Sequence, residues 1–405
     1  MIDRLQQAPP EILPVGEGVP FYSEKVPGDV ERGLGGMYGG WGRRVPNENL
    51  PSYVADFLGR SLDPNEILEL ESKGFKSRYS TLHLRSDDQK LEQALAETLV
   101  GMKSVEGAIW ENGWDSSEID AVVIGMSSPL DPDFTVDLAN LSGISPYAKK
   151  VTVHTACDSS MRGLNWVLDP KNGLYGKKVI LGGLENLSRS LTGGDGTRPT
   201  KDTQALQLFA NAVGFIGIVP GVSIQPIAVR SETKYDEKAA LQVAVNYPMP
   251  TQGENVAEKY DSSKNHLTIS GRIPKPGDGT GVVMANNKEM LKLFGINTAE
   301  IVKQILIEMQ ENLGLQGDPN AWFQWVVMHH ANLKIIEFQS KKLGNDNYPL
   351  DLAAYWVVNE FGNVSAASPM ISWLRQSQNM VSGTRGLFIG YGAGGHYDVI
   401  AAEVP

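Results

Sequence analysis

Cysteine is nearly absent from this chain of 405 residues, which contains only one. A single cysteine excludes an internal disulfide framework. The chain also lacks an apolar run long enough to span a membrane, and it lacks the basic start and apolar stretch of a signal peptide. We therefore expect a cytoplasmic protein. The six histidines and the cysteine do not form a group with the spacing of metal ligands, so we expect no metal site.

Positive charges are outnumbered by negative ones: the chain has 36 Lys and Arg against 47 Asp and Glu, and its formal net charge is −11. Such a chain would be repelled by nucleic acid and by anionic membranes, and we expect neither as a partner. An acidic protein partner would need a local basic patch. The hydrophobic fraction of 41% and the charged fraction of 20% are those of a globular protein with one large or two ordinary domains.

Helical and strand patterns alternate along the chain, which is typical of an α/β protein. Residues 12–21 predict a first strand, and the glycine-rich residues 28–42 predict an inserted surface loop. A helix is predicted from Ser86, which can cap its N-terminus, to about Trp110. The nearly continuous apolar residues 119–126 predict a buried strand.

The same order of elements recurs later in the chain, as a helix at 299–312, a turn at 313–320 and a strand at 322–328. In the first copy Cys157 starts a helix, and a strand follows at 179–183. In the second copy Asn363 starts a helix, and a strand follows at 386–390.

This duplication predicts two similar α/β halves, residues 1–235 and 236–405, with equivalent strand ends converging. Cys157 and Asn363 would then face each other. The polar residues 187–203 and 246–272 are predicted to be long loops or excursions.

Cys157 lies where an apolar strand gives way to a helix. At a helix N-terminus a thiol meets free backbone N–H groups and the positive end of the helix dipole, and both favour the thiolate. A free cysteine can equally be an inert core residue. The position alone leaves both interpretations open, so partner residues have to decide between them.

Three segments supply such partners: Thr155-Ala-Cys157-Asp, Met328-His-His-Ala-Asn332-Leu-Lys and Phe361-Gly-Asn363-Val-Ser-Ala-Ala-Ser. In this order, and with the glycine turn at 390–395, they resemble β-ketoacyl-acyl-carrier-protein synthase III and its relatives in the thiolase superfamily. The resemblance covers roughly residue 55 to the end. It implies the α/β thiolase fold, in which two pseudo-duplicated halves form five layers, αβαβα, and it implies a homodimer.

The resemblance assigns catalysis to Cys157, His329 and Asn363. Cys157 would take an acyl group as a thioester, and His329 and Asn363 would stabilise the enolate left when a malonyl thioester loses carbon dioxide. Backbone N–H groups of Cys157, Gly392 and Ala393 would form the oxyanion hole. The acyl groups would arrive on coenzyme A or on the phosphopantetheine of an acyl carrier protein, and no further cofactor would be needed.

The choice between His329 and His330 follows from strand geometry, because adjacent strand residues point to opposite faces. The family register selects His329. His330 and His154 are expected to pack away from the site, whereas His396 could reach its mouth. The turn at 390–395 also matches the dinucleotide pattern G-x-G-x-x-G, but a strand follows it instead of a helix, so we expect no dinucleotide.

Two departures from the family pattern concern the substrate and the nucleophile. Asp158 stands where the family has a small apolar residue, and its charge would oppose a thiolate at Cys157. Leu68 and Ser72 occupy the positions of the family's coenzyme A-binding Trp and Arg. Free coenzyme A should therefore bind poorly.

Basic residues instead match the family positions that receive an acidic carrier protein. These residues are Lys334, Lys341 and Lys342, with Asn332 nearby. Lys334 and Lys341 are seven residues apart and so lie on one helical face. An ordinary solvated face would look the same. We expect an acyl carrier protein and its phosphopantetheine to dock here.

Several other functions could use the same fold. A thiolase would need a second cysteine, which the chain lacks, but iterative condensation of the chalcone-synthase kind stays open. An acyltransferase could pass the acyl group from Cys157 to an alcohol or amine with His329 as base. A silent partner subunit would be expected to lose one of the three catalytic residues. The extra loops favour polyketide or other secondary metabolism over routine fatty-acid initiation.

Overall fold

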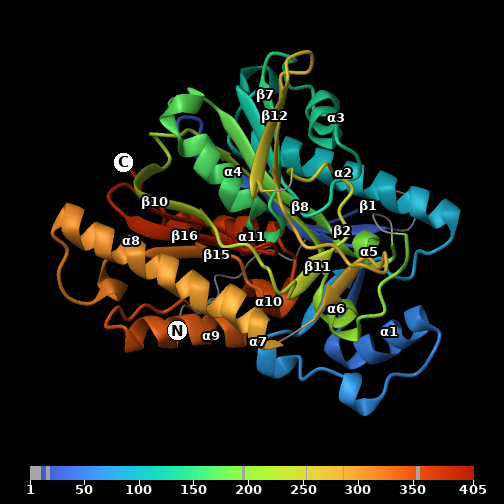
Figure 1. Cartoon of the computed structure of the whole chain (residues 1–405). Helices are drawn as coiled ribbons and strands as arrows, with labels where there is room; N and C mark the ends of the chain where they lie inside the picture. The colour runs from blue at the N-terminus through green and yellow to red at the C-terminus, as the bar shows by residue number, and fades with distance from the viewer. Residues whose placement is uncertain (1–10, 15–18, 194–196, 252, 286, 353–355) are drawn as a thin grey trace.

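The computed structural model describes residues 11–14, 19–193, 197–251, 253–285, 287–352 and 356–405. Two β-sheets organise these residues (Figure 1). In the larger sheet the strands run in the spatial order β1 (Glu11–Pro14), β2 (Pro20–Val26), β3 (Gly33–Trp41), β9 (Asn211–Ile218), β8 (Val179–Asn186), β6 (Ala121–Gly125), β7 (Lys149–His154), β13 (His266–Gly271) and β12 (Val256–Asp261).

The smaller sheet and two ribbons complete the described strands. The smaller sheet has the order β10 (Gln225–Thr233), β17 (His396–Glu403), β16 (Arg385–Gly392) and β15 (Trp325–Met328). In the ribbons β11 (Leu241–Val243) pairs with β14 (Val282–Met284), and β4 (Arg43–Pro46) pairs with β5 (Ser77–Ser80).

Helices lie on both outer faces and between the sheets, which gives the predicted five layers αβαβα. The helices α4 (Ser159–Leu168) and α11 (Ala367–Gln376) pack between the sheets, since each contacts strands of both. The helices α2 (Asp87–Glu111) and α3 (Phe134–Leu141) cover the larger sheet, and α8 (Asn297–Leu313) covers the smaller sheet, with α9 (Leu333–Asn345) beside it. The shorter helices are α1 (Leu50–Leu58), α5 (Leu187–Leu191), α6 (Thr203–Leu208), α7 (Asn287–Met290) and α10 (Trp356–Phe361).

Several predicted elements are confirmed. Helix α2 begins directly after Ser86, whose hydroxyl accepts a hydrogen bond from the Gln89 backbone N–H at 3.3 Å while the Gln89 side chain accepts from the Ser86 N–H at 3.1 Å. This capping box satisfies two of the free N–H groups of the first turn. Helix α8 and strand β15 also lie where the second copy of the pattern places them.

The glycine-rich residues 28–42 were wrongly predicted to be a surface loop, because most of them form the buried strand β3 between β2 and β9. Their glycines serve close packing. A Cβ atom at Gly36 would come within 2.0 Å of the Phe215 carbonyl oxygen, and one at Gly40 within 2.0 Å of the Tyr79 ring. Glycine therefore lets this strand approach its neighbours where a side chain would not fit.

The two predicted loops are also partly wrong. Residues 246–272 contain the hairpin β12–β13, and β13 pairs in parallel with β7, the strand that leads to Cys157. The predicted loop at 187–203 begins with α5. Polar side chains misled the prediction because β12 lies at an edge of the sheet, where half-exposed strands can be polar.

Each sheet takes strands from both predicted halves of the chain. Strand β10, from residues before 235, lies in the smaller sheet with β15, β16 and β17. The hairpin β12–β13, from residues after 235, extends the larger sheet. The fold is therefore one body in which the two sheets exchange segments.

Candidate active site

Cys157 lies in a tight turn between β7 and α4, as the sequence predicts. The turn, Ala156–Asp158, is a single 3₁₀ turn, and Ala156 has the positive φ of 54° that L-residues rarely adopt. The Ser159 hydroxyl holds the turn, since it accepts from the Thr155 N–H at 2.8 Å and donates to the Ala156 carbonyl at 2.6 Å. This sharp turn presents Cys157 at the end of the sheet.

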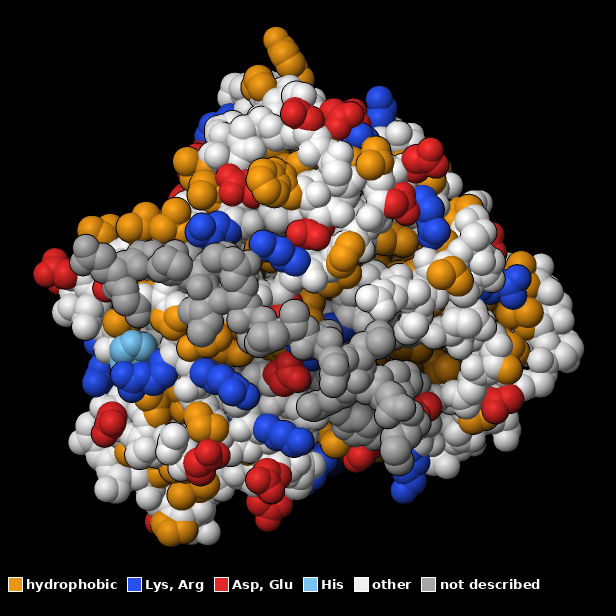
Figure 2. Space-filling view, turned by 180° about the vertical axis from the view of Figure 1, so that it is seen from behind, with side chains coloured by type: hydrophobic (Ala, Val, Ile, Leu, Met, Phe, Trp, Pro, Cys, Tyr) orange, Lys and Arg blue, Asp and Glu red, His pale blue; other side chains and the backbone are white. Residues whose placement is uncertain are grey.

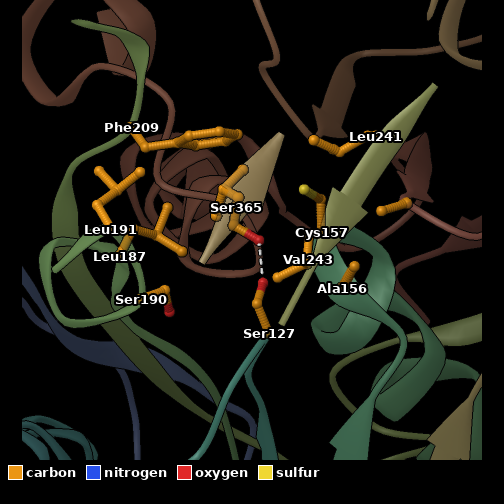
Figure 3. Close-up of a pocket in the computed structure, with 12 residues that line it drawn as sticks. Ser127, Ala156, Cys157, Leu187, Ser190, Leu191, Phe209, Leu241, Val243 and Ser365 are labelled. Carbon is orange, nitrogen blue, oxygen red and sulfur yellow. Dashed lines mark hydrogen bonds between the residues drawn. The ribbon is translucent and has the colours of Figure 1, made fainter. Parts of the chain in front are cut away.

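The side chain of Cys157 faces a narrow, mostly apolar cavity. Figure 3 shows its sulfur directed into the space that the lining residues surround. Helix α5, Phe209 and the β11–β14 ribbon supply the apolar walls. The lining residues are Ser127, Ala156, Cys157, Leu187, Ser190, Leu191, Phe209, Leu241, Val243, Val282, Ser365 and Ala393. Such a cavity can hold an apolar acyl group on the sulfur.

Ser365 connects the three residues predicted to be catalytic. Its side chain lies next to the Cys157 thiol and its backbone lies next to His329. Its backbone N–H donates to the Asn363 side-chain oxygen at 3.1 Å. The Tyr391 ring lies 4.9 Å from the His329 ring, and its hydroxyl donates to the His329 carbonyl at 3.0 Å. Cys157, His329 and Asn363 therefore gather around one residue, although His329 and Asn363 do not line the cavity.

Burial controls the protonation of Cys157 and His329. It raises the pKa of the Cys157 thiol to about 12, and the neighbouring Ser365 side chain only partly opposes this. It lowers the pKa of His329 to about 3. Burial of Cys157 therefore opposes the thiolate that its position at a helix N-terminus favours. Both groups are neutral at pH 7.

The predicted oxyanion-hole residues lie against one another. Ala393 lines the cavity with Cys157. A Cβ atom at Gly392 would come within 2.9 Å of the Cys157 backbone nitrogen and 2.7 Å of the Thr155 carbonyl oxygen. Only glycine lets the turn after β16 approach the Cys157 amide this closely.

A buried glutamate next to the cavity was missed by the sequence analysis. Ser127 Oγ and Ser365 Oγ are 2.6 Å apart, as the dashed line in Figure 3 shows, and Ser127 Oγ donates to Glu185 Oε1 at 2.8 Å. Burial raises the pKa of Glu185 to about 8. Two hydrogen-bonded hydroxyls thus lie between Cys157 and a buried carboxyl group. The signal was present in the sequence, because an acidic residue ends the apolar run at 179–184.

The residues predicted to receive a carrier protein lie on and beside α9. Asn332 caps this helix, since its side-chain oxygen accepts from the Ile335 N–H at 3.0 Å. Lys334 and Lys341 are exposed, whereas Lys342 forms an ion pair with Asp346 at 3.2 Å. Lys73, which was not among the predicted residues, lies near Lys334, and its pKa is lowered by burial and by the charge of Lys334.

One face of the molecule carries charges of both signs. Figure 2 shows a face on which Lys and Arg side chains are interspersed with Asp and Glu side chains. The coenzyme A positions also lack a cation: Leu68 packs against the core, and the Ser72 hydroxyl donates to the Glu69 carbonyl at 2.9 Å.

The other histidines lie away from the cavity. His154 stacks on Tyr247 with ring centroids 4.3 Å apart, and the His330 N–H donates to the Ser368 hydroxyl at 2.9 Å. His396 is fully buried and hydrogen-bonds to the Arg272 carbonyl at 3.1 Å, so it does not reach the mouth of the site. Among the described residues no group of three or more His, Cys, Asp or Glu could hold a metal ion. No helix in the described part of the chain is long and apolar enough to cross a membrane.

Comparisons with known proteins show which sequences and folds this chain is similar to. The C-terminal family model of 3-oxoacyl-[acyl-carrier-protein] synthase III matches residues 320–404. β-Ketoacyl-[acyl-carrier-protein] synthase III of Clostridium tetani is 24% identical over 315 residues, which are 73% of this chain and 80% of that protein. The enzyme of that name from Yersinia enterocolitica is 26% identical over 66% of this chain and 70% of its own length.

Solved structures share the whole fold. The synthase III of Pseudomonas aeruginosa has a TM-score of 0.60 and 16% identity, with 98% of this chain and 99% of the other covered. The tetrahydroxynaphthalene synthase of Streptomyces coelicolor, a type III polyketide synthase, has a TM-score of 0.63 and 14% identity, with 94% and 97% covered. This chain is therefore similar in sequence to β-ketoacyl-[acyl-carrier-protein] synthase III, and over nearly its whole length it has the thiolase fold of these solved structures.

Proposed function

We propose that this protein catalyses a decarboxylative Claisen condensation between an acyl group on Cys157 and a malonyl-type thioester. The direction of the Cys157 sulfur into an apolar cavity beside the Gly392–Ala393 backbone is the observation that carries the proposal. The thiol attacks the donor thioester, a bond forms between the sulfur and the acyl carbon, and the donor thiol leaves. Backbone N–H groups of Cys157 and Ala393 stabilise the oxyanion.

The neutral state of His329 favours condensation over simple acyl transfer. An imidazole with a pKa of about 3 is a poor general base at pH 7, and transfer to an alcohol or amine would need one. A neutral imidazole can still donate a hydrogen bond to an enolate oxygen. With the Asn363 amide it would stabilise the carbanion that remains after loss of carbon dioxide, and this carbanion attacks the acyl carbon on Cys157.

Acidic carrier proteins are the proposed donors for at least one of the two thioesters. The exposed Lys334 and Lys341 support this, as does the absence of a cation at Ser72 for free coenzyme A. The reaction needs no resident cofactor, because both reacting groups arrive as thioesters. We further propose that the protein is a cytoplasmic homodimer and that it acts in polyketide or related secondary metabolism.

Intact mass spectrometry with a panel of acyl thioesters tests the first half-reaction. A mass increase equal to one acyl group, absent from Cys157→Ala, is expected. Labelled malonyl thioester tests the second half-reaction by the release of labelled carbon dioxide. Acylation that survives Cys157→Ala would refute the role of this residue, and acyl transfer without carbon dioxide release would favour the acyltransferase.

A further inference from the structure

A second buried carboxyl group lies directly beside the nucleophile and takes no part in the reaction above. Asp158 has no exposed surface, and neither of its carboxyl oxygens has a hydrogen-bond partner in the described residues. The nearest cation is Arg162, whose Nη2 lies 3.7 Å from Asp158 Oδ2. An ionised carboxylate without hydrogen bonds is very costly to bury.

The same guanidinium is held more closely by another carboxyl group, Asp398 on β17. Arg162 Nε lies 2.5 Å from Asp398 Oδ2, and the Asn165 amide donates to Asp398 Oδ1 at 2.8 Å. Asp398 thus has the close contacts of a carboxylate, whereas Asp158 has only the longer approach of Arg162 at 3.7 Å. Two ionised carboxylates around one guanidinium would leave a net negative charge in the interior.

Asp158 also lies between the two walls of the oxyanion hole. Its backbone belongs to the Cys157 turn, and its Oδ1 lies against Gly390, where a Cβ atom would approach to 2.2 Å. Gly390 is the register partner of Asp398, and the strand that contains it leads to Gly392 two residues later. The carboxyl group therefore fills the contact between the nucleophile turn and the β16–β17 hairpin.

We propose that Asp158 is the protonated one of the two carboxyl groups that share Arg162, with Asp398 ionised, and that this cluster is a positioning device that holds the two walls of the oxyanion hole together. The inference rests on the proposed function for its catalytic part. Burial, together with the charge of Asp398, raises the pKa of Asp158 well above its usual range, and Arg162 only partly opposes this.

The other titratable groups near Asp158, Asp398 and Arg162 do not change the assignment of the proton to Asp158. His396 is neutral because burial lowers its pKa to about 3, and Tyr397 is a neutral phenol whose pKa burial raises. Glu258 is exposed on β12 and acts on Arg162 only from a distance. A neutral Asp158 explains how an acidic residue can follow the nucleophile, because it adds no negative charge beside the Cys157 sulfur.

Infrared difference spectroscopy of the intact protein at pH 7 tests the protonation. The spectrum of the wild type minus that of Asp158→Asn should show the carbonyl band of a buried carboxylic acid. Asp398→Asn should abolish the same band although Asp158 remains, because Arg162 then has Asp158 as its only carboxylate. If Asp158→Asn removes carboxylate bands and not the acid band, Asp158 is ionised and the assignment is overturned. An acid band that persists in Asp398→Asn would also overturn it.

Two rates measured on Asp158→Ala test the positioning role. Acylation of Cys157 passes through an oxyanion and should fall about 10- to 100-fold. Alkylation by iodoacetamide is a direct displacement without an oxyanion and should change less than about threefold. Equal losses in both rates, or no loss in either, would overturn the role. The infrared and alkylation readouts need no acyl donor, so they remain decisive even if the proposed condensation fails.

Discussion

Glu185 makes the stability of this protein depend on pH in a calculable way. Its carboxyl group is 1% exposed, and burial raises its pKa from 4.5 to about 8, which hydrogen bonds from Ser127 and Ala366 only partly oppose. A carboxyl group with a raised pKa binds its proton more tightly in the folded state. Its contribution to stability is therefore complete below pH 4.5 and is lost as the pH rises toward 8.

The expected magnitude follows from these two pKa values. Each pH unit between them costs ~1.4 kcal/mol of unfolding free energy, so the full loss between pH 4.5 and 8 is about 5 kcal/mol. Glu185→Gln has the same shape and cannot ionise. Relative to that variant, the wild type should lose about 4 kcal/mol between pH 5 and pH 8, and nothing further above pH 9.

Urea unfolding followed by tryptophan fluorescence at each pH from 5 to 9 measures this loss. Glu106→Gln makes the same chemical change at an exposed position of α2 and should give a curve parallel to the wild type. If the Glu185→Gln curve is also parallel to that of the wild type, Glu185 is not protonated in the folded protein, and the reasoning from its burial is refuted.

Three further predictions concern the site itself. Gly392→Ala should reduce acylation of Cys157 at least about 100-fold, measured by rapid-quench mass spectrometry, because its Cβ would meet the nucleophile turn; an unchanged rate would exclude the close approach. Val243→Phe should fill the cavity and shift donor preference toward shorter acyl chains by about tenfold or more, and an unchanged preference would place the acyl group elsewhere. The double variant Lys334→Glu, Lys341→Glu should slow reaction with carrier-bound thioesters while sparing free thioesters, and equal rates with both would count against carrier docking.

Much of the site could be predicted because its residues occur at recognisable places in the chain. Cys157 after a strand, and His329 at the end of another strand, are local patterns that a single sequence displays. The folded chain brings both next to Ser365. The protonation states could not be predicted in the same way, because desolvation depends on the apolar walls that distant segments contribute.

The errors in the fold have a common physical cause. Glycines in β3 were taken for loop residues because the close approach of Gly36 to Phe215 can be seen only when both strands are placed. The hairpin β12–β13 was taken for a loop because edge strands tolerate polar residues. Glu185 was passed over because its partners, Ser127 and Ala366, are far away in the sequence. Local composition indicates the propensity of a segment to form a helix, strand or loop, whereas the two strand regions and the burial of Glu185 depend on tertiary contacts.

The exchange of strands between the two sheets also determines the order in which the chain can fold. Strand β10 pairs with β17, although Gln225 and its partner Glu403 are separated by nearly 180 residues. Strand β7, which leads to the nucleophile, receives its neighbour β13 more than 100 residues later. Closing such long loops costs entropy before any contact compensates it, so folding should be slow. During synthesis the smaller sheet cannot be completed until residues near 400 have left the ribosome, and until then β10 remains an open edge that chaperones would need to protect.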